Sequence, residues 1–355
     1  MKIGIFDPYL DDLGGGEKYM MTIAQCLSSE HDVDVFWNDE EDAKELQVRF
    51  SLGLSKINFV KNVFSAKINL FKRLWETKKY DVIIILSDGS IPFTLSKKIF
   101  IHFQQPILLP QLNIKGKIKI KRINGFFCNS RYTKSYIDKS LGVNSLVLYP
   151  PVEIKLKKIK RENIILHVGR FRVKNVDADD YKKQKVMVDV FKEMIKNGLK
   201  NWKLVIAVSV RDNEQIFFND FRKRAEGFPI EFLLNKSNDE LWDIYSRSKI
   251  YWHASGFGED LKKHPEYAEH FGISTVEAMG AGAVPVVINA GGQKETVEGN
   301  KNGFLWNTLD ELMGKTKLLT ENEKLWKKMS GEAMKRAKFF AGNRFCNDLK
   351  KNLEL

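Results

Sequence analysis

Residues 269–288 read EHFGISTVEAMGAGAVPVVI, and two patterns in this stretch decide the fold. The first half predicts a short helix over residues 274–279, and the apolar, β-branched run over residues 284–288 predicts a buried strand. Strand-sized and helix-length segments alternate in the same way along nearly the whole chain. This alternation is typical of a parallel sheet wound with helices, so we predict an α/β fold.

The alternation falls into two blocks separated by Pro150-Pro151, a pair that cannot enter a regular element and that opens a Lys-rich connector. We predict two doubly wound, Rossmann-like domains, residues 1–150 and 151–340, and a helical tail with a break near Ala341-Gly342. Two such domains in tandem place the carboxyl ends of their strands around a central cleft, where ligands of open α/β sheets bind. Strands are expected over residues 3–6, 33–37, 57–60, 82–86, 99–103, 126–129, 146–149, 164–168, 204–208, 231–234, 250–252 and 284–288, and helices over residues 17–27, 185–197, 239–246 and 274–279.

The composition is that of a globular protein, with 43% apolar and 29% charged residues in a chain of 355. The apolar run at residues 82–86 is far shorter than the roughly 20 residues that cross a bilayer, and the first residues, MKIGIF, are too short and polar for a secretion signal. The chain contains three cysteines, Cys26, Cys128 and Cys346, which is an odd number, and they lie far apart in the sequence. We therefore expect reduced thiols and no metal site. The expected location is the cytoplasm.

The basic charge is concentrated in one segment. Residues 56–134 contain 16 Lys or Arg and three acidic residues, a net charge of +13 that equals the net charge of the whole chain. Such a face attracts phosphate-bearing partners: anionic lipid headgroups, nucleotides or nucleic acid. The sequence lacks the zinc-finger, RNA-binding and basic-zipper motifs that read a nucleic acid, so we expect no nucleic-acid partner.

Two stretches of this basic segment allow more than one structure. In AKINLFKRLWETKKY, residues 66–80, the side chains of Ile68, Phe71 and Trp75 share one helical face between lysines, as on a helix that lies in a membrane interface. The same apolar stripe would also suit a helix that covers a sheet. The run KGKIKIKR, residues 115–122, alternates like a strand but equally fits a solvated loop.

Two groups of residues suggest phosphate binding. Gly14–Gly16 separate the first predicted strand from the first helix, where glycines let a ligand approach the backbone and the helix end attracts an anion; a plain tight turn is the alternative. In the second block, a strand ends at Gly169-Arg170, and Lys182 or Lys183 precedes the next helix. An arginine and a lysine placed together can neutralise a diphosphate. Lysines that are merely solvated at the start of a surface helix would give the same sequence pattern.

A third group, Glu269 to Glu277, surrounds a predicted helix start. The amides of Gly272 and Ile273 would lie at the helix N-terminus, where they can bind ligand oxygens. Ser274 and Glu277 also match the S-x-x-E capping box. In that case Glu277 would only stabilise the start of the helix and would not bind a ligand.

Together these motifs resemble glycosyltransferase family 4, whose members have the GT-B fold. The resemblance covers nearly the whole chain in the family's order, and the EHFGI block is most similar to the lipid-linked oligosaccharide mannosyltransferase branch. The matching motifs are GGGE at 14–17, HFQQP at 102–106, CNSRYTKSY at 128–136, YPPV at 149–152, GRF and KKQ at 169–171 and 182–184, and the block from EHFGI to NGFLW at 269–306.

The resemblance implies a role for each matching residue of the second domain. Glu269 would face the hydroxyls of the donor sugar, and Glu277 would bind the nucleotide ribose. Arg170 and Lys182 would hold the donor diphosphate and stabilise it as a leaving group. Because the insertion VKNVDADDY, residues 173–181, lengthens the family's spacing, Lys183 is the alternative to Lys182. Sugar or phosphate oxygens would also meet the backbone of Phe271, Gly272 and Ile273.

In the first domain, the resemblance places Gly15 and Gly16 near the donor phosphate and His102 beside the transferred sugar. His102 follows an apolar run, so a core histidine is the alternative. Asp88 and Ser90, after the strand over residues 82–86, are candidate acceptor contacts. The tail, residues 341–355, would pack back on the first domain as in other GT-B proteins.

The implied function is transfer of a hexose, with retention of configuration, from GDP-mannose or a UDP-sugar to a lipid-linked or polysaccharide acceptor. No cofactor and no metal are expected, because arginine and lysine take the place of a cation on the diphosphate. The basic segment, residues 56–134, is expected to contact the anionic cytosolic face of a membrane. The alternatives are a non-catalytic protein of GT-B fold that binds nucleotide sugars or anionic membranes, and a GT-B nucleotide-sugar epimerase.

Overall fold

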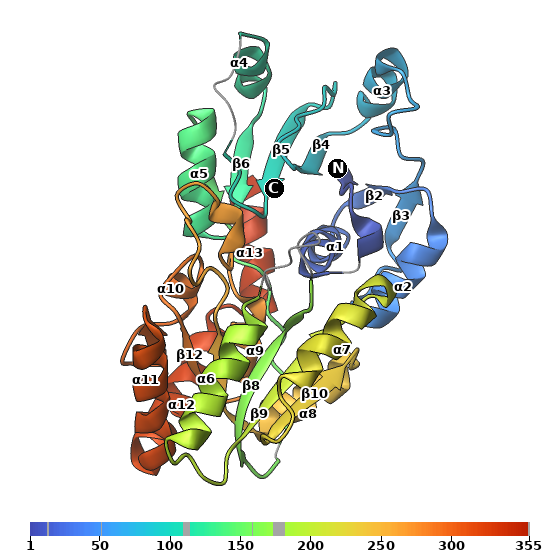
Figure 1. The fold of residues 1–355 in the computed structure, drawn as a ribbon. Helices are drawn as coiled ribbons and strands as arrows, with labels where there is room; N and C mark the ends of the chain where they lie inside the picture. Colours follow the sequence, from blue (N-terminus) through green and yellow to red (C-terminus); the bar gives the residue numbers. More distant parts are fainter. Residues whose placement is uncertain (13, 51, 109–113, 158, 173–181, 354–355) are drawn as a thin grey trace. The chain divides into compact units, whose positions relative to one another are not determined.

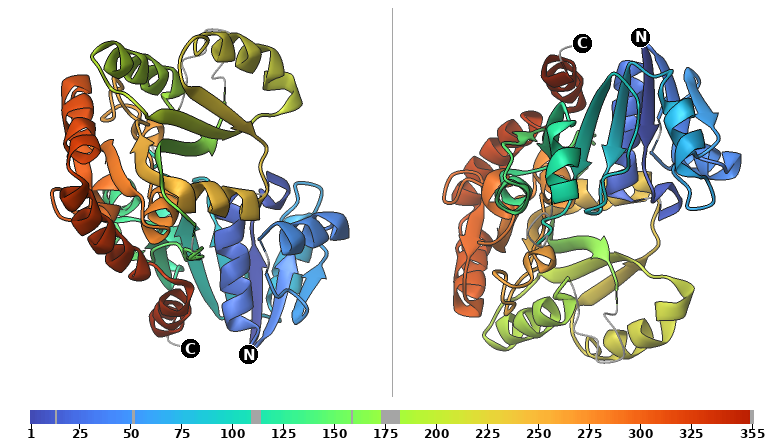
Figure 2. Two further views of the ribbon diagram at one scale, coloured as in Figure 1. Left: turned by 90° about the horizontal axis from the view of Figure 1, so that it is seen from below. Right: turned by 90° about the horizontal axis from the view of Figure 1, so that it is seen from above.

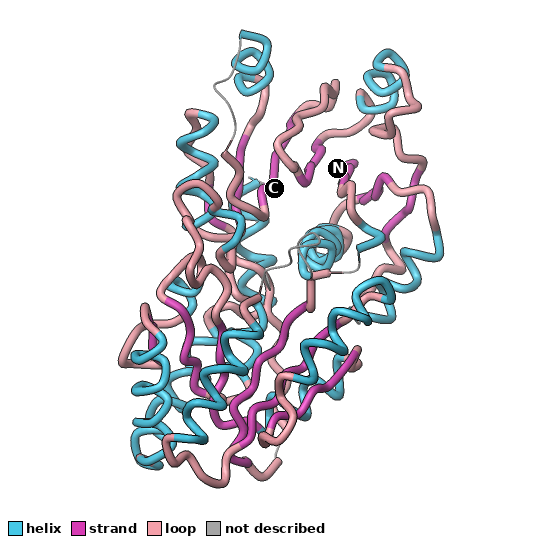
Figure 3. The backbone as a smooth tube through the Cα atoms, viewed as in Figure 1, coloured by secondary structure: helices cyan, strands magenta, loops and turns pink. Residues whose placement is uncertain are grey.

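The structure is a computed structural model that describes residues 1–12, 14–50, 52–108, 114–157, 159–172 and 182–353 (Figure 1). The chain divides into two units. Unit 1 contains Met1–Pro151 and Gly342–Leu355, and unit 2 contains Val152–Ala341. The insertion VKNVDADDY lies outside the described residues. In each unit helices and strands alternate along the chain (Figure 3).

Unit 1 is built on a parallel sheet of seven strands in the order β3-β2-β1-β4-β5-β6-β7. The strands are β1 (Lys2–Phe6), β2 (Asp32–Phe36), β3 (Ile57–Val60), β4 (Val82–Leu86), β5 (Lys98–Phe103), β6 (Gly125–Cys128) and β7 (Leu146–Val147). The helices are α1 (Gly15–Leu27), α2 (Glu40–Phe50), α3 (Leu70–Thr77), α4 (Ile114–Lys121), α5 (Arg131–Leu141) and α13 (Gly342–Leu353).

Both faces of this sheet are covered, which explains the continuous apolar sequence of its central strand. In β4, Val82 and Ile84 belong to the core cluster that contains α1 residues, whereas Ile83 and Ile85 belong to the cluster on the other face, with Ile137 of α5. A strand buried on both sides needs apolar side chains at every position. The α/β prediction is confirmed for this half of the chain.

The last helix of the chain belongs to unit 1. Phe345, on α13, packs edge-on against Tyr19 of α1, with ring centroids 5.1 Å apart, and Lys350 pairs with Glu30 at 2.6 Å. Figure 2 shows this red C-terminal helix with the blue-to-green part of the chain. The unit therefore contains both the first and the last described helix.

A disulfide joins the same two helices, Cys26 of α1 to Cys346 of α13. The prediction that all three thiols are reduced is therefore wrong for these two; Cys128 is free and buried. A separation of 320 residues along the chain does not determine distance in the fold, because the last helix packs on the first. The spacing of the cysteines therefore does not indicate a reducing compartment.

The structure decides between alternatives in the basic segment. Phe71 and Trp75 on α3 are 84% and 77% exposed, which excludes the alternative in which this stripe covers the sheet. The run KGKIKIKR is neither a strand nor a loop, because most of it forms α4. Ile118 of α4 is 60% exposed. Among the described helices, none is long and apolar enough to span a bilayer.

Unit 2 is built on a parallel sheet of six strands in the order β10-β9-β8-β11-β12-β13. The strands are β8 (Glu162–Arg170), β9 (Lys203–Ser209), β10 (Ile230–Leu234), β11 (Ser248–His253), β12 (Val284–Ile288) and β13 (Phe304–Trp306). The helices are α6 (Gln184–Lys196), α7 (Gln215–Lys223), α8 (Asn238–Arg247), α9 (Ile273–Gly280), α10 (Gln293–Thr296), α11 (Leu309–Glu321) and α12 (Glu323–Lys338).

Candidate functional site

The strand order of unit 2 identifies where a ligand should bind. From β8 the chain continues to one side through β9 and β10, and it then returns to the other side of β8 as β11. In open α/β sheets the ligand site lies at the carboxyl ends of the strands where the order reverses. Gly169-Arg170 end β8 and His253 ends β11, so these residues lie at that reversal.

Glu269 is the centre of a charged cluster next to these strand ends. One carboxylate oxygen, Oε2, accepts hydrogen bonds from Lys182 Nζ at 2.8 Å and from His253 Nε2 at 2.9 Å. The backbone N–H of Ser255 donates to His253 Nδ1 at 3.4 Å, so the proton of the imidazole is assigned to Nε2, the nitrogen that faces the acid. The other carboxylate oxygen, Oε1, has no hydrogen-bond partner among the described residues.

The protonation states of this cluster follow from its surroundings. Burial alone would raise the pKa of Glu269, but the Lys182 ammonium and the His253 hydrogen bond outweigh it and hold the pKa well below its usual range. Burial lowers the pKa of His253 despite its hydrogen bond to Glu269. At neutral pH the cluster is thus an ionised carboxylate between an ammonium and a neutral imidazole, and its open oxygen can accept hydrogen bonds from hydroxyl groups.

The second acid of the motif has a partner that excludes the capping box. Glu277 lies on α9 and accepts a hydrogen bond from the hydroxyl of Tyr245 at 3.0 Å. Ser274 lies inside the first turn, where its hydroxyl pairs with Tyr251 Oη at 2.7 Å. The residue that precedes the helix is Gly272, in the left-handed conformation with φ of 99°. Glu277 therefore does not cap the helix, and its carboxylate lies half-buried beside a tyrosine.

The two candidate lysines have different neighbours. Lys182 contacts Glu269, as described, whereas Lys183 Nζ lies 2.6 Å from Glu259. Lys183 also precedes α6 with φ of 57°, a conformation that an L-residue adopts at a cost. Arg170 forms no ion pair with a carboxylate among the described residues. The geometry thus brings Lys182, rather than Lys183, into the Glu269 cluster.

Three contributors to this site, His253, Gly291 and Gly292, were not predicted from the sequence. His253 fixes Glu269, and its position at the carboxyl end of a predicted strand was the available signal. Gly291 and Gly292 approach the backbone of residues 269–270 so closely that a Cβ on either would collide with it, and Gly292 N donates to Glu269 O at 2.7 Å. These contacts hold the loop before α9 in place, and they depend on the tertiary fold.

In unit 1, the glycine motif forms the start of α1. Gly14 is the residue before the helix, and Gly15 and Gly16 begin it. The Gln104 side chain donates to Gly16 O at 3.0 Å and occupies the space that a Cβ of Gly16 would need. Glu17 accepts a hydrogen bond from Gly14 N. The motif therefore holds the backbone of a helix N-terminus close to a neighbouring polar side chain.

The structure supports the core alternative for His102. Its ring has no exposed surface and stacks between Tyr19 and Phe127, with centroids 4.2 and 4.6 Å away. Nδ1 lies 3.1 Å from Phe127 O, and burial lowers the pKa of the ring to about 3. A neutral, fully buried imidazole has no surface with which to touch a substrate, so we do not include it in the site.

Asp88 and Ser90 form a polar turn after β4. Asp88 Oδ1 accepts hydrogen bonds from Ser90 N at 3.1 Å and Ser90 Oγ at 2.8 Å, and Oδ2 accepts one from Tyr9 Oη at 3.0 Å. Burial would raise the pKa of Asp88, but these hydrogen bonds lower it. The turn thus presents an ionised carboxylate at the carboxyl end of β4.

Curated relatives of this chain include transferases that act on lipid-linked sugars. GDP-Man:Man(3)GlcNAc(2)-PP-Dol alpha-1,2-mannosyltransferase of Dictyostelium discoideum is 28% identical over 233 residues, which are 61% of this chain and 43% of that protein. The protein of the same name from Neurospora crassa is 26% identical over 52% of this chain and 36% of its own length. The matched part thus spans less than half of these relatives.

One relative matches over nearly its whole length. GalNAc-alpha-(1->4)-GalNAc-alpha-(1->3)-diNAcBac-PP-undecaprenol alpha-1,4-N-acetyl-D-galactosaminyltransferase of Campylobacter jejuni is 24% identical over 369 aligned positions, 96% of this chain and 94% of that protein.

Solved structures share the fold over the whole chain. Anabaena HepE in complex with UDP-glucose matches with a TM-score of 0.72 at 16% identity, covering 100% of this chain and 99% of that one. A glycosyltransferase from Rickettsia africae matches with a TM-score of 0.73 at 16% identity, covering 99% and 97%. The fold is therefore the GT-B fold of glycosyltransferases. The model of the family described as glycosyl transferases group 1 matches residues 152–336, more than half of the chain, and the chain belongs to this family.

Proposed function

We propose that this protein transfers a hexose from a nucleoside-diphosphate sugar to a lipid-linked or other glycan acceptor, with retention of configuration. The observation that carries the proposal is the Glu269 cluster at the strand-order reversal of unit 2, where an ionised acid with one open oxygen lies beside Lys182. A donor sugar presents hydroxyl groups and a diphosphate, and these are the two chemistries that the cluster can bind.

Arg170 and Lys182 act on the diphosphate in this proposal. Bond cleavage places negative charge on the phosphate oxygens, and cations fixed before the reaction stabilise that charge more in the transition state than in the substrate. Glu269 holds the Lys182 ammonium at 2.8 Å, so the lysine is oriented before the donor binds. The N-terminal turn of α9, at Gly272 and Ile273, adds backbone N–H groups and the positive end of a helix dipole.

Glu269 binds the sugar rather than attacking it. Its pKa is depressed, so it carries no proton to donate as an acid, and its open Oε1 accepts hydrogen bonds from the sugar hydroxyls. Glu277, beside Tyr245, is assigned to the ribose hydroxyls of the nucleotide. The acceptor hydroxyl then attacks the face from which the phosphate leaves, and the departing phosphate takes its proton.

The acceptor class is inferred from relatives. The mannosyltransferases named above use GDP-mannose and dolichol-diphosphate oligosaccharides, and the Campylobacter protein uses an undecaprenol-diphosphate oligosaccharide. A lipid-linked acceptor requires access to a membrane surface. On α3, Phe71 and Trp75 are exposed among Lys72, Lys78 and Lys79, which suits a helix lying among anionic headgroups.

A thermal-shift screen tests the donor half of the proposal. Wild-type protein is heated with GDP, UDP or ADP and their hexose conjugates, since a ligand at about 100 times its Kd stabilises the folded state by about 2.7 kcal/mol. We expect a shift with one nucleotide series, reduced in Arg170→Ala and Glu277→Gln and kept in Arg222→Ala, an exposed arginine of the same unit. Absence of a shift with every nucleotide would contradict the proposal.

Turnover separates the transferase from its alternatives. Release of nucleoside diphosphate that depends on an added polyprenyl-diphosphate sugar supports transfer. A binding protein would bind the donor without turnover, and an epimerase would convert the donor with no acceptor present. Either of those results would replace the proposed activity.

A further inference from the structure

A histidine and a glutamine lie buried next to the candidate site of unit 2. In β8 the sequence IILHV, residues 164–168, contains a single polar residue, His167. Gln184 is the first residue of α6. Neither side chain has any exposed surface, so neither can touch a donor. Any effect that these two residues have on the site must therefore pass through other residues.

The contacts of His167 fix which ring nitrogen carries the proton. Burial lowers the pKa of His167 to about 3, so at neutral pH the ring has one donor and one acceptor nitrogen. Nδ1 lies 3.0 Å from Trp252 O, which can only accept, and the proton is therefore assigned to Nδ1. Nε2 is then an acceptor, and it lies 3.4 Å from Gln184 Nε2. The same assignment orients the glutamine, because only its NH₂ group can donate to the ring.

The NH₂ group of Gln184 has a second acceptor, the backbone of Arg170. It donates to Arg170 O at 3.4 Å and thereby joins the end of β8 to the start of α6. Arg170 and Lys182, the two candidate diphosphate cations, are separated in sequence by the insertion at residues 173–181. So long a stretch does not by itself set the distance between its ends. Gln184 can set it, because it bonds to the backbone of the arginine and follows the lysine by two residues.

A second set of contacts leads from His167 to the acid of the site. The ring of His253 lies beside that of His167, with centroids 5.8 Å apart. His253 donates to Glu269, which also accepts from Lys182. The adjoining histidines are therefore connected to Arg170 on one side, through the glutamine amide, and to Glu269 and Lys182 on the other.

Stability does not explain this buried polar pair. Gln184 Oε1 is buried without a hydrogen-bond partner among the described residues, and an unpaired amide oxygen in the interior costs stability. An apolar side chain of the same length would fill the space without that cost. The geometry is better explained by the groups that the pair holds.

We infer that His167 and Gln184 are positioning residues of the donor site, which hold Arg170 and Lys182 at the separation that a nucleoside diphosphate requires. The inference rests on the proposed function, because that proposal assigns the two cations to the donor diphosphate. Hydrogen bonds weaken steeply as their distance and angle change, so a shift of either cation loses affinity. A nucleoside monophosphate has one phosphate and does not need both cations. The buried pair should therefore set the preference for diphosphates over monophosphates.

The test measures this preference by calorimetry, as the Kd of GMP, UMP or AMP divided by that of GDP, UDP or ADP. We expect the wild type to prefer one diphosphate. Gln184→Met keeps the length of the side chain and removes the amide, whereas His167→Asn keeps a donor for Trp252 O and removes the acceptor for Gln184. Each should reduce the preference by at least about fivefold, because misplaced cations make poorer charge-assisted hydrogen bonds. The double variant should lose no more than the larger single loss, since both changes break one bond.

Two further variants separate positioning from a general loss of stability. Thr316→Val removes another buried hydrogen bond of unit 2, from Trp252 Nε1 at 3.0 Å. It should lower the midpoint of urea unfolding about as much as Gln184→Met and leave the preference unchanged. His167→Gln restores an acceptor for Gln184 and should recover part of the preference lost in His167→Asn. Unchanged preference in Gln184→Met, equal loss in Thr316→Val, or equal values in the two His167 variants would overturn the inference.

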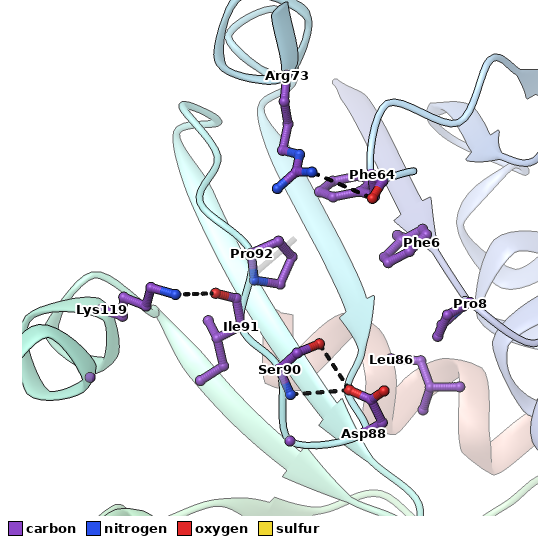
Figure 4. A pocket seen from close by; sticks show the side chains of 12 residues that line it. Phe6, Pro8, Phe64, Arg73, Leu86, Asp88, Ser90, Ile91, Pro92 and Lys119 are labelled. Carbon is purple, nitrogen blue, oxygen red and sulfur yellow. Dashed lines mark hydrogen bonds between the residues drawn. The ribbon is translucent and has the colours of Figure 1, made fainter. Parts of the chain in front are cut away.

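A control in unit 1 establishes where the diphosphate binds. Arg73 and Lys119 line a cavity of about 520 Å³ at the carboxyl ends of β1 and β4 (Figure 4). Arg73 donates to Val63 O at 3.2 Å and Lys119 donates to Ile91 O at 3.1 Å, and neutral carbonyl oxygens do not cancel the charge of either cation. The double variant Arg73→Gln with Lys119→Gln should keep the diphosphate preference. Loss of the preference there would place the diphosphate in unit 1 and contradict the inference.

Binding and turnover together distinguish this inference from the proposed function. If the variants lose the diphosphate preference but the wild type shows no acceptor-dependent turnover, the transfer reaction fails and the positioning role stands. If the wild type turns over and Gln184→Met keeps the full preference, the positioning role fails and the transfer reaction stands. A wild type that prefers none of the three diphosphates would remove both.

Discussion

At the level of single residues, the site of unit 2 depends on charges held in fixed positions. Glu269 is ionised because Lys182 and His253 outweigh its burial, and His253 stays neutral because it is buried. The proposed chemistry requires this combination, since a protonated Glu269 would neither orient the lysine nor accept two hydroxyl hydrogens. The residue next in sequence, Lys183, pairs with Glu259 instead.

The two lysines give a direct prediction. Lys182→Ala should lower kcat/KM by about 100- to 1,000-fold, the usual cost of one fixed group that stabilises transition-state charge. Lys183→Gly should keep nearly full activity and change the free energy of unfolding by no more than about 1 kcal/mol, because glycine adopts the left-handed conformation at that position freely. Steady-state kinetics and urea unfolding of both variants measure this. The reverse pattern would assign the diphosphate to Lys183.

The buried histidines give a prediction for pH. Burial lowers the pKa of His102 and of His167 to about 3, against 6.5 for the unperturbed group. Between pH 6.5 and 3 the unfolded chain binds protons that the folded protein does not, so stability falls as pH falls. Each of these histidines should remove about 2 kcal/mol between pH 6.5 and 5. His102→Phe keeps the ring stacking and should make the pH dependence of urea unfolding shallower; an unchanged slope would contradict the assignment.

The motifs named Glu269, Glu277, Arg170 and the lysine pair as candidate donor-site residues, and that assignment stays a prediction. Their contacts could not be read from the sequence, and the structure was needed to see that Lys182 rather than Lys183 contacts Glu269. The role of His102 could not be decided from the sequence, because a histidine that follows an apolar run gives the same pattern whether its ring faces the core or a ligand. The capping box failed because Ser274 lies two residues past the N-cap position, which Gly272 occupies.

At the level of elements, the long buried strands were predicted closely and the basic segment was not. The run over residues 82–86 became β4 without change, because a strand buried on both faces has an unambiguous sequence. The stripe of α3 was ambiguous, since a helix against a sheet and a helix against a membrane show the same periodicity. In α4, alternating Lys and Ile suggested a strand or a solvated loop, whereas the segment forms a helix.

Exposure of the α3 stripe predicts a membrane phenotype without a folding phenotype. Phe71→Ser combined with Trp75→Ser should reduce co-sedimentation with anionic vesicles several-fold while changing the free energy of unfolding by less than about 0.5 kcal/mol, because these side chains bury little surface. The matched control is Ile216→Ser with Phe217→Ser, an exposed apolar pair of α7 in unit 2. Equal loss of vesicle binding in the control pair would contradict a specific role for α3.

At the level of the whole molecule, the two sheets follow the same order over six strands, to which unit 1 adds β7, and each has a cavity or a charged cluster at the reversal of that order. Unit 2 holds the Glu269 cluster between the ends of β8 and β11, and unit 1 holds the cavity between the ends of β1 and β4. The repeated strand-and-helix pattern predicted both sheets except the edge strand β13, Phe304–Trp306, which was not among the expected strands. The pairing of Cys26 with Cys346 could not be predicted, because pairing of distant cysteines depends on packing that local sequence patterns do not encode.

The disulfide between the first and last helices predicts a response to reduction. Cys346→Ala should destabilise unit 1 by about 2 to 4 kcal/mol, and a reducing agent should destabilise the wild type similarly and the variant no further. Thiol labelling in denaturant, followed by mass spectrometry, should modify one cysteine before reduction and all three afterwards. Labelling of all three before reduction would show that the bond is not formed.

The helix α13 also determines the order in which the molecule can be completed during translation. Residues 152–341, which make up unit 2, are all synthesised before residues 342–353. Until then the α1 face of unit 1 lacks Phe345, Leu349 and Leu353, side chains that are at least 97% buried in the finished protein. The half of the protein that is synthesised first is therefore the half that is completed last, and a nascent chain stalled before residue 342 would present this apolar face to chaperones.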